Sequence, residues 1–561
     1  MNPTQARTIP ELLRERTLDA PEQTAFVHLA DGEAREEAIS RRDLLAGAAG
    51  IGERLGASAA GERALLLYPS GLEFIKAFLG CLMAGTIAVP TFPPRFRASP
   101  PEGSAGEKTR DHNLERLRGI IRDAEPSLLL CPRSLAPGLE ANRAEFPGIE
   151  IIVTDEIAPG DWTTPGREIT ADTIAFLQYT SGSTGAPRGV RITQGNLMAN
   201  EAMIQRTFGT PDEMLVVGWL PLNHDMGLIG QILQPLYNGG RCIFMSPMHF
   251  LQQPFRWLDA ISRFGANTSP APNFAYEHCL DRVTDEQIAR LDLSTWIRAL
   301  SGAEPVRHRT LERFAERFAP TGFRREAFYP CYGLAEATLV VSGSKLQPTP
   351  RVLPVENSEE GLTGCGGVDP ELELILVNSE DEPMAREGDV GEIWLRGASI
   401  APGYWNTGAG DGVFEGRTKA GEGPYLRTGD LGFLRDGELF ITGRIKDLLI
   451  IDGRNLYPQD IEGLIMEQYP ACKAAAAFAL ERDGEEQIGT AIELRRGHGA
   501  DLRELGDALR SELSRVFGAS VGALVFLRPG SLPRTSSGKL RRARTRELFL
   551  AGELAVLETT S

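Results

Sequence analysis

Metal-ligating and disulfide-forming residues are scarce in this sequence. Only 7 cysteines and 7 histidines occur among 561 residues. No two cysteines have the C-x-x-C spacing and their number is odd, which argues against a zinc site and against a complete disulfide framework. The pattern is typical of reduced thiols, and we therefore expect a cytoplasmic protein.

A long apolar run is also missing. The longest one, Ala77–Val89, ends at Pro90, and it is shorter than the roughly 20 residues that a membrane-spanning helix needs. Charged residues such as Glu11 and Arg14 interrupt the beginning of the chain, where a signal peptide would be apolar. We expect neither a transmembrane segment nor a signal peptide.

Basic residues are fewer than acidic ones, so that the formal net charge is -17 and the pI is about 5.1. Nucleic-acid-binding domains are usually basic, so no nucleic-acid partner is expected. An anionic ligand would have to be held by local cations and backbone N–H groups. The hydrophobic share of 42% and the charged share of 24% are ordinary for a folded protein.

Strand and helix patterns alternate in the first part of the chain. The apolar stretches Ala64–Tyr68 and Thr86–Val89 predict strands, and Gly71–Met83 between them predicts a helix. The alternation predicts an α/β fold with layered sheets and helices. Arg97–Lys108 is rich in proline, glycine, serine and charge, and predicts a surface loop.

The pattern changes near residue 430. Asp436-Gly437 lies between two apolar runs and predicts a β-hairpin. The chain from the apolar run Leu448–Ile451 through Ser561 is long enough for a small α+β domain. We therefore predict a large N-terminal α/β domain of several subdomains over residues 1–445 and a small C-terminal domain over residues 446–561, with the boundary at Lys446.

The segment Tyr179–Gly189 (YTSGSTGAPRG) follows a predicted strand, Ile174–Leu177. Its hydroxyl groups and converging backbone N–H groups suit an anion, and Arg188 adds a positive charge. The spacing is not that of a Walker loop, and a flexible polar turn is the alternative interpretation. The candidate anion-binding residues are Thr180, Ser181, Gly182, Ser183, Thr184 and Gly185.

The segment Cys331–Thr338 (CYGLAEAT) combines three useful properties. Tyr332 offers an aromatic face, Gly333 permits close approach, and Glu336 offers an oxygen ligand for magnesium. A glutamate that begins a helix is the alternative interpretation.

Two further segments each contain one candidate polar group. In Tyr425–Asp430 (YLRTGD), the carboxylate of Asp430 can accept hydrogen bonds from two vicinal hydroxyls, although a plain turn is the alternative. In Pro533–Arg541 (PRTSSGKLR), Lys539 could bridge a carboxylate and a phosphate, or it could be a solvated surface lysine.

These segments, in this order, resemble the core motifs of the adenylate-forming superfamily, which includes acyl-CoA synthetases, luciferases and the adenylation domains of peptide synthetases. The resemblance spans nearly the whole chain. Within the superfamily the sequence is most similar to the fatty acyl-AMP ligases. This likeness is carried by Trp219–Tyr237 (WLPLNHDMGLIGQILQPLY), Tyr332–Gly343 (YGLAEATLVVSG) and Gly453–Glu462 (GRNLYPQDIE).

The resemblance implies roles for individual residues. Lys539 would be the catalytic lysine, and Lys446 the hinge between the domains. His224 would separate the acyl and nucleotide pockets, and Glu336 would bind Mg²⁺. The implied nucleotide-binding residues are Thr180–Gly185 and Arg188 on phosphates, Gly302, Ala303, Glu304, Tyr332 and Gly333 around adenine, Asp430 on the ribose hydroxyls, and Arg444 on the ribose or a phosphate.

The implied function is ATP-dependent activation of a medium- or long-chain fatty acid to an acyl-AMP with release of pyrophosphate. Transfer of the acyl group to the phosphopantetheine thiol of an acyl carrier protein would follow. A basic segment containing Lys539, Arg541, Arg542, Arg544 and Arg546 could receive an acidic carrier protein, and a solvated helix face is the alternative.

Three departures from the family pattern matter. Arg188 stands where most members have lysine, and Asn223 stands where an aromatic residue is common. The stretch Ser344–Gly364 is shorter than the usual insertion of fatty acyl-AMP ligases, which keeps an acyl-CoA synthetase as the alternative.

Two other functions are disfavoured. An amino-acid adenylation domain would carry an acidic residue in an F-D-x-S context, whereas this chain has LNHDMG. A nucleotide-binding protein without ligase activity would be expected to have lost Lys539, Glu336 or Asp430, and all three are present.

Overall fold

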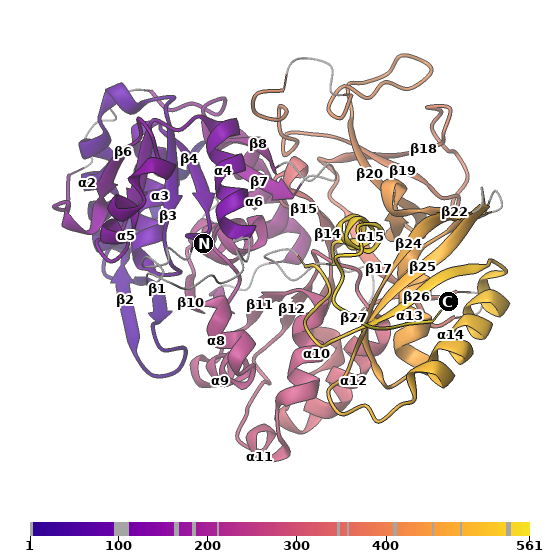
Figure 1. Cartoon of the computed structure of the whole chain (residues 1–561). Coiled ribbons are helices and arrows are strands. Elements are labelled where there is room, and N and C mark those ends of the chain that lie inside the picture. Colours follow the sequence, from indigo (N-terminus) through magenta and orange to yellow (C-terminus); the bar gives the residue numbers. More distant parts are fainter. Residues whose placement is uncertain are drawn as a thin grey trace.

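Within the residues that the structure describes, three large β-sheets, a four-stranded C-terminal sheet and the two-stranded pair β22–β23 form the framework of the molecule (Figure 1). The structure is a computed structural model. It describes residues 4–94, 112–161, 168–181, 187–209, 213–344, 348–355, 358–407, 412–451, 454–482, 485–534 and 540–560. The surface loop predicted over Arg97–Lys108 lies outside the described residues.

The first sheet is built from buried apolar strands. Leu65, Leu66 and Leu67 are fully buried, as a strand covered on both faces requires. Its strands are parallel except for an antiparallel pair at one edge. In order they are β6 (Glu150–Val153), β5 (Leu128–Cys131), β3 (Arg63–Leu67), β4 (Ile87–Thr91), β7 (Ile174–Ser181) and β8 (Pro187–Thr193).

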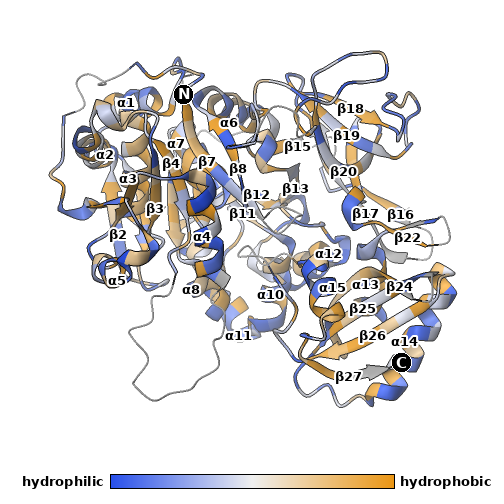
Figure 2. Ribbon diagram, turned by 45° about the horizontal axis from the view of Figure 1, so that its top comes forward, coloured by the Kyte–Doolittle hydropathy of each residue, from blue (hydrophilic) through white to orange (hydrophobic). Residues whose placement is uncertain are grey.

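Helices cover both faces of this sheet. One face packs with helices α1, α2 and α3, and the other packs with α4 and α5. Figure 2 shows β3 and β4 as mostly hydrophobic and α4 as largely hydrophilic. The predicted strand–helix–strand pattern is therefore confirmed. The helices are α1 (Ile9–Asp19), α2 (Arg41–Leu55), α3 (Leu72–Ala84), α4 (His112–Ala124) and α5 (Ala136–Ala141).

The second sheet shares a core with the first. Val216, Cys242 and Phe244 from this sheet lie in the same cluster as Leu66 and Ala88 from the first. Its order is β13 (Phe328–Pro330), β12 (Arg298–Ser301), β11 (Thr268–Ala271), β9 (Leu215–Gly218), β10 (Arg241–Met245), β1 (Thr24–Leu29) and β2 (Glu36–Ser40).

Aromatic side chains fill the other face of the second sheet. Trp257, Trp296, Tyr276 and Phe314 are all fully buried there. The helices between residues 194 and 318 are α6 (Gln194–Phe208), α7 (Gln234–Tyr237), α8 (Pro247–Gln252), α9 (Phe255–Phe264), α10 (Asn273–Arg282), α11 (Asp285–Ile288) and α12 (His308–Phe318).

The third sheet is antiparallel and includes the predicted hairpin. Asp436 and Gly437 have φ angles of 50° and 78°, as a tight hairpin turn requires. Along the sheet the strands are β14 (Tyr332–Gly333), β15 (Val340–Ser344), β17 (Ser358–Val368), β21 (Glu438–Arg444), β20 (Leu426–Arg435), β19 (Gly391–Arg396) and β18 (Glu373–Val377), and β16 (Val352–Val355) pairs with β17.

The C-terminal region has cores of its own. Their buried residues run from Leu449 to Leu532. This arrangement confirms the α/β class with a small α+β unit, while the boundary at Lys446 stays a prediction. The elements are β22 (Leu449–Ile451), β23 (Arg454–Leu456), α13 (Pro458–Gln468), β24 (Cys472–Arg482), β25 (Glu485–Leu494), α14 (Leu502–Phe517), β26 (Val521–Leu527), α15 (Arg542–Leu550) and β27 (Val556–Thr560).

Membrane-crossing helices were searched for over the described residues. None of their helices combines the length and the apolar character that a bilayer crossing requires.

Candidate active site

A cavity of about 590 Å³ lies where the first two sheets meet the third sheet and the start of the C-terminal region. Ligand pockets in proteins commonly have volumes of roughly 300–1,000 Å³. Ten of the residues predicted for the site line it, namely Thr180, Arg188, His224, Gly302, Ala303, Tyr332, Gly333, Glu336, Arg444 and Lys446.

Glu336 is held by a tyrosine. The hydroxyl of Tyr404 donates a hydrogen bond of 2.7 Å to Oε1 of Glu336. The guanidinium of Arg188, on β8, lies 5.2 Å from the centre of the Tyr404 ring, within cation–π range. Glu336 and Arg188 therefore face one end of the cavity, with Tyr404 between them.

Asp430 joins two other predicted residues. Its carboxylate accepts a hydrogen bond of 2.6 Å from the Tyr332 hydroxyl and another of 2.6 Å from Nε of Arg444. Burial raises the pKa of Tyr332 well above its usual value, and the Asp430 carboxylate raises the pKa of Arg444. Asp430, itself buried, thus lies beside the cavity with Tyr332 and Arg444 oriented by it.

His224 lies at the start of an unusual helix. Its Nδ1 is 2.5 Å from Oδ1 of Asp225, and Asp225 accepts a hydrogen bond from the backbone N–H of Met226. A π-helix, η4 (Met226–Leu233), follows. π-Helical turns are rare and are frequent at functional sites, and this one forms part of the cavity wall through Met226 and Gly230.

Backbone geometry is unusual on two sides of the cavity. Ala303 and Thr338 are non-glycine residues with φ angles of 67° and 72°. A Cβ at Gly333 would collide with the carbonyl oxygen of Leu339, so only glycine fits there. Strained backbone of this kind clusters at ligand-binding sites.

Part of the cavity lining is apolar, and we call that part the apolar branch. Polar side chains such as Gln234, at the start of α7, and Thr268, on β11, line the same cavity. The apolar lining includes Ile204, Phe208, Met214, Met226, Leu339 and Val340. The cavity therefore combines a polar end with an apolar branch.

Some predicted residues lie elsewhere. The side chain of Glu304 accepts a hydrogen bond of 2.5 Å from the N–H of Phe274 and is not among the residues that line the cavity. Residues 182–186 and 535–539 lie outside the described residues, and so does the side chain of Ser181. The positions of Gly182, Ser183, Thr184, Gly185 and Lys539 are therefore not described.

Sequence reasoning missed many residues that line the cavity, and four polar ones among them are Arg116, Gln178, Tyr404 and Asp447. Arg116 donates a hydrogen bond to the carbonyl of Tyr179, and Gln178 donates one to the carbonyl of Asn223. An aromatic residue in the glycine-containing loop APGYW was the signal available for Tyr404. Asp447 directly follows the predicted hinge residue Lys446, whereas Arg116 and Gln178 have no local sequence signal.

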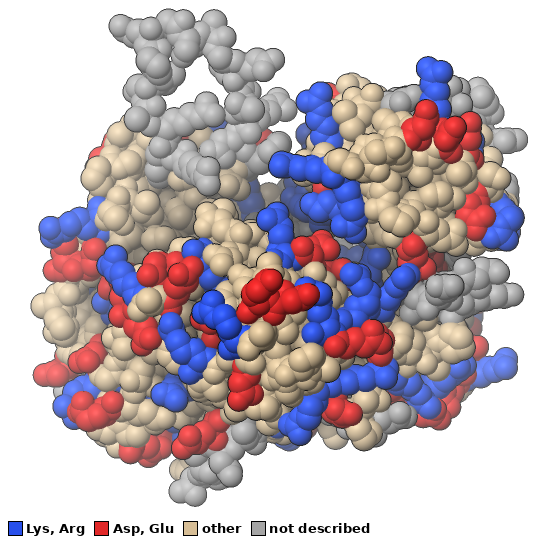
Figure 3. Space-filling view, turned by 90° about the horizontal axis from the view of Figure 1, so that it is seen from below, with Lys and Arg blue, Asp and Glu red and all other residues tan. Residues whose placement is uncertain are grey.

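The basic C-terminal segment is not the open cationic face that the sequence suggested. Arg542 donates two hydrogen bonds, of 2.6 and 2.8 Å, to Glu462. Arg544 is paired with Glu547, and Arg546 donates to the carbonyl of Ala479. Arg542 is engaged by the buried carboxylate of Glu462, which requires a partner, and a docking role for the segment stays a prediction. Figure 3 shows basic and acidic side chains interspersed across one face of the molecule.

The chemistry of the donor set limits the metal that the site can hold. Within the described ranges, no group of three or more His, Cys, Asp or Glu residues is placed to hold a metal ion. Magnesium, however, is commonly bound by one or two carboxylates together with phosphate oxygens and water. The single carboxylate of Glu336 fits that mode of binding.

Comparisons with known proteins give a consistent result. The family model described as AMP-binding enzyme matches residues 13–405. The medium-chain-fatty-acid–[acyl-carrier-protein] ligase JamA of Moorena producens (strain JHB) is 40% identical, with 99% of this chain and 97% of that protein covered. The long-chain-fatty-acid–AMP ligase FadD26 of Mycobacterium tuberculosis (strain ATCC 25618 / H37Rv) is 37% identical, with 98% of each covered.

Solved structures agree. A fatty acyl-adenylate ligase from L. pneumophila, in complex with acyl adenylate and pyrophosphate, has 36% sequence identity and a TM-score of 0.73, with 99% of this chain and 98% of that chain covered. A structure from a study of fatty acyl-adenylate ligases from E. coli and L. pneumophila has 32% identity and a TM-score of 0.85, with 98% of each chain covered.

Proposed function

This chain belongs to the AMP-binding enzymes and, among them, to the fatty acyl-AMP ligases, and we propose on that premise that it activates a medium- or long-chain fatty acid with ATP. The products are an acyl-AMP and pyrophosphate. The acyl group then passes to the phosphopantetheine thiol of an acyl carrier protein.

One observation carries the proposal. A single cavity joins a polar end, which contains Arg188, Glu336 and Arg444, to an apolar branch lined by Phe208 and Met214. A fatty acid places its carboxylate and its alkyl chain in two such environments at once. His224 lies in the same lining, which supports its assignment as the wall between the acyl and nucleotide subsites.

Adenylation needs positioning and charge neutralisation more than covalent chemistry by the protein. A carboxylate oxygen attacks the α-phosphorus, and pyrophosphate leaves. Arg188 opposes the charge of the phosphates, Asp430 accepts hydrogen bonds from the ribose hydroxyls, and Tyr332 lies against adenine. Lys539 draws the carboxylate and the α-phosphate together. Magnesium, held by Glu336, would supply further neutralisation of the phosphate charge.

Thiol transfer needs a different surface over the acyl-AMP. We propose that the C-terminal domain, residues 446–561, rotates about Lys446 to withdraw Lys539 and to admit the thiol. The lining position of Lys446 supports this assignment, because the hinge lies directly at the cavity.

An acyl-CoA synthetase is the second candidate, since Ser344–Gly364 is short. Part of that stretch pairs as the strands β16 and β17, and β17 pairs with β21. β17 also lies against α13 of the C-terminal region. A strand in that position is suited to restrain the C-terminal domain, which favours the ligase.

The test is a comparison of acyl acceptors. Purified enzyme receives ATP, magnesium and a series of saturated fatty acids, with CoA or a phosphopantetheinylated carrier protein as acceptor. Carrier protein without phosphopantetheine is the matched control. We expect thioester on the modified carrier protein alone. Efficient formation of acyl-CoA would assign the chain to the synthetases.

Lys539→Ala separates adenylation from binding. Loss of one electrostatic group of this kind lowers the rate by roughly 100- to 1,000-fold. We expect the rate of pyrophosphate release to fall by this factor, while the variant still binds ATP. Unimpaired release would remove Lys539 from the mechanism.

A further inference from the structure

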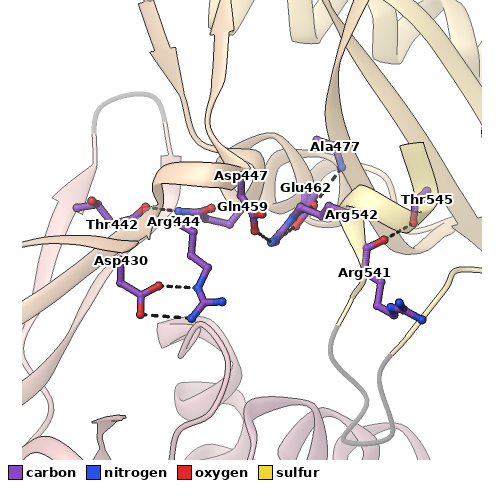
Figure 4. Close-up of polar contacts among 10 residues, drawn as sticks. All are labelled: Asp430, Thr442, Arg444, Asp447, Gln459, Glu462, Ala477, Arg541, Arg542 and Thr545. Carbon is purple, nitrogen blue, oxygen red and sulfur yellow. Dashed lines mark hydrogen bonds and ion pairs between the residues drawn. The ribbon is translucent and has the colours of Figure 1, made fainter. Parts of the chain in front are cut away.

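The chain passes from the third sheet into the C-terminal region through a very short segment. β21 ends at Arg444, and the next residues, Ile445–Asp447, form a short 3-10 helix. Leu448 then leads into β22. Figure 4 shows the contacts of Arg444 and Asp447, which lie at the two ends of this segment. The residues at the two ends of this segment are both engaged in ion pairs.

On the side of the third sheet, Arg444 is fixed to Asp430 on β20. Nε of Arg444 donates to Oδ1 of Asp430 at 2.6 Å, and the Asp430 side chain is 6% exposed. Backbone pairing between β20 and β21 places the same two residues opposite each other. Arg444 therefore moves with the N-terminal domain.

On the other side, Asp447 is fixed to Arg542 at the start of α15. Nη1 of Arg542 donates to Oδ2 of Asp447 at 3.0 Å. The remaining nitrogens of the guanidinium donate to Glu462 on α13. We call Asp447, Glu462 and Arg542 the arginine clamp.

Glu462 connects the arginine clamp to the buried core of the C-terminal region. Its side chain is 1% exposed, and its Oε1 also accepts a hydrogen bond of 3.0 Å from the N–H of Ala477 on β24. A buried carboxylate with three donors keeps a fixed orientation. Arg542 is fixed in turn, and Asp447 moves with α13, β24 and α15.

Ile445 and Lys446 are the two residues between these fixed points. Both are exposed, and Ile445 has 42% of its surface in contact with solvent. Hydrogen bonds also link the two sides of this pair. The N–H of Leu448 donates to the carbonyl of Arg444 at 3.2 Å, and the side-chain amide of Gln459 on α13 donates to the carbonyl of Thr442 on β21 (Figure 4).

We propose that Arg542 is a positioning residue, whose hold on Asp447 confines the rotation of the C-terminal domain to Ile445 and Lys446. This inference rests on the proposed two-step function. With the clamp closed, the domain turns as one body between two defined orientations. With Asp447 released, the rotation is spread over more bonds, and the thiol-accepting orientation is reached less often.

The first experiment does not depend on activity. Hydrogen–deuterium exchange of the peptide that contains the Leu448 amide is measured in the wild type, in Asp447→Asn and in Arg542→Lys. Asp447→Asn leaves the Arg542–Glu462 pair intact, so the core of the domain is retained. We expect exchange of this peptide to be about tenfold faster in both variants, with other peptides of the domain unchanged for Asp447→Asn.

Two further variants serve as controls. Asp447→Glu keeps a carboxylate within reach of Arg542 and should restore slow exchange. Arg515→Lys disturbs an exposed arginine–glutamate pair within one helix, with Glu512 on α14, and should leave the Leu448 peptide unchanged. The proposal would be overturned if the Leu448 peptide of Asp447→Asn exchanged as slowly as that of the wild type. It would also be overturned if Arg515→Lys accelerated exchange of this peptide as much as Asp447→Asn does.

The second experiment measures the two half-reactions separately. Pyrophosphate release reports adenylation, and a single turnover of preformed acyl-AMP with the modified carrier protein reports transfer. We expect Asp447→Asn to lower the ratio of transfer to adenylation about tenfold, and Asp447→Glu to restore it. Equal slowing of both steps would contradict the positioning role. Absence of acyl-AMP in the wild type would instead refute the proposed function, and the exchange experiment would still decide the clamp.

Discussion

At the scale of single residues, the site depends on pairs that lie far apart in the sequence. Tyr404 donates to Glu336 across 68 positions, and Tyr332 donates to Asp430 across 98. Glu336, Tyr332 and Asp430 each lie in a recognisable motif, so the sequence was sufficient to propose them. Tyr404 was missed because its contact arises only when the loop after β19 folds over the 3-10 turn that contains Glu336.

Tyr404→Phe tests the orientation of Glu336. The hydroxyl that fixes the carboxylate is lost while the ring under Arg188 is kept. We expect the magnesium concentration for half-maximal pyrophosphate release to rise by about tenfold or more, since a lost hydrogen bond to a charged group costs roughly 1.5–3 kcal/mol. A magnesium titration measures it.

Tyr425→Phe is the matched control. Tyr425 donates a hydrogen bond of 2.7 Å to Glu373, in a pair that is not part of the cavity lining. Its magnesium dependence should equal that of the wild type. An unchanged magnesium dependence in Tyr404→Phe would show that the tyrosine does not orient Glu336.

At the scale of elements, the strands were predictable and the π-helix was not. Fully buried apolar runs such as those of β3 and β4 have few alternatives to a parallel strand. The run that forms η4 is apolar throughout, and hydropathy alone does not separate i→i+4 from i→i+5 hydrogen bonding. The shape of the apolar branch, which η4 helps to form, was therefore beyond sequence reasoning.

Gly230→Leu tests the role of η4 in chain-length selection. Gly230 lines the cavity, and a Cβ there would already lie 3.3 Å from Leu339. The added side chain should shorten the apolar branch. Because each excluded methylene forfeits roughly 0.8 kcal/mol, we expect kcat/KM to fall at least tenfold for the longest acids accepted and to change little for the shortest. A uniform loss across the series would contradict this assignment.

Asp460, in the first turn of α13, gives a pH-dependent prediction. Burial, together with the charge of Glu462, raises the pKa of Asp460 to about 6. An acid whose pKa is raised by folding destabilises the folded state above that pKa, and the penalty disappears as the pH falls toward the unfolded pKa. Asp460→Asn should therefore stabilise the protein by roughly 1–3 kcal/mol at pH 7.5.

The stabilisation of the folded state by Asp460→Asn should depend on pH. Thermal unfolding should give a difference in the free energy of unfolding between Asp460→Asn and the wild type. This difference should have its full size above about pH 6 and should shrink between pH 6 and pH 4. A difference that stays constant over this range would contradict the raised pKa of Asp460.

At the scale of the whole molecule, the sequence predicted a division that the cores support. The apolar residues after Leu448 form clusters of their own, and Arg444 and Asp447 are held from opposite sides. The boundary at Lys446 could be proposed from the sequence because the hairpin is a local pattern, and it stays a prediction. The sequence could not reveal the arginine clamp, since Asp447 and Arg542 are 95 positions apart.

Lys446→Pro tests the hinge itself. Proline fixes φ near −65° and so restricts one of the two residues between the fixed points. We expect acyl transfer to slow at least tenfold more than pyrophosphate release does. Single-turnover measurements of both steps give the comparison, and equal slowing would count against rotation at Lys446.

The most direct test of the central claim follows an oxygen atom. A fatty acid with ¹⁸O in its carboxylate is incubated with the enzyme, ATP and modified carrier protein, and the AMP is analysed by mass spectrometry. If the carboxylate attacks the α-phosphorus and the thiol then attacks the acyl carbon, the AMP carries one ¹⁸O atom. AMP without the label, or ADP as the nucleotide product, would contradict an acyl-adenylate intermediate.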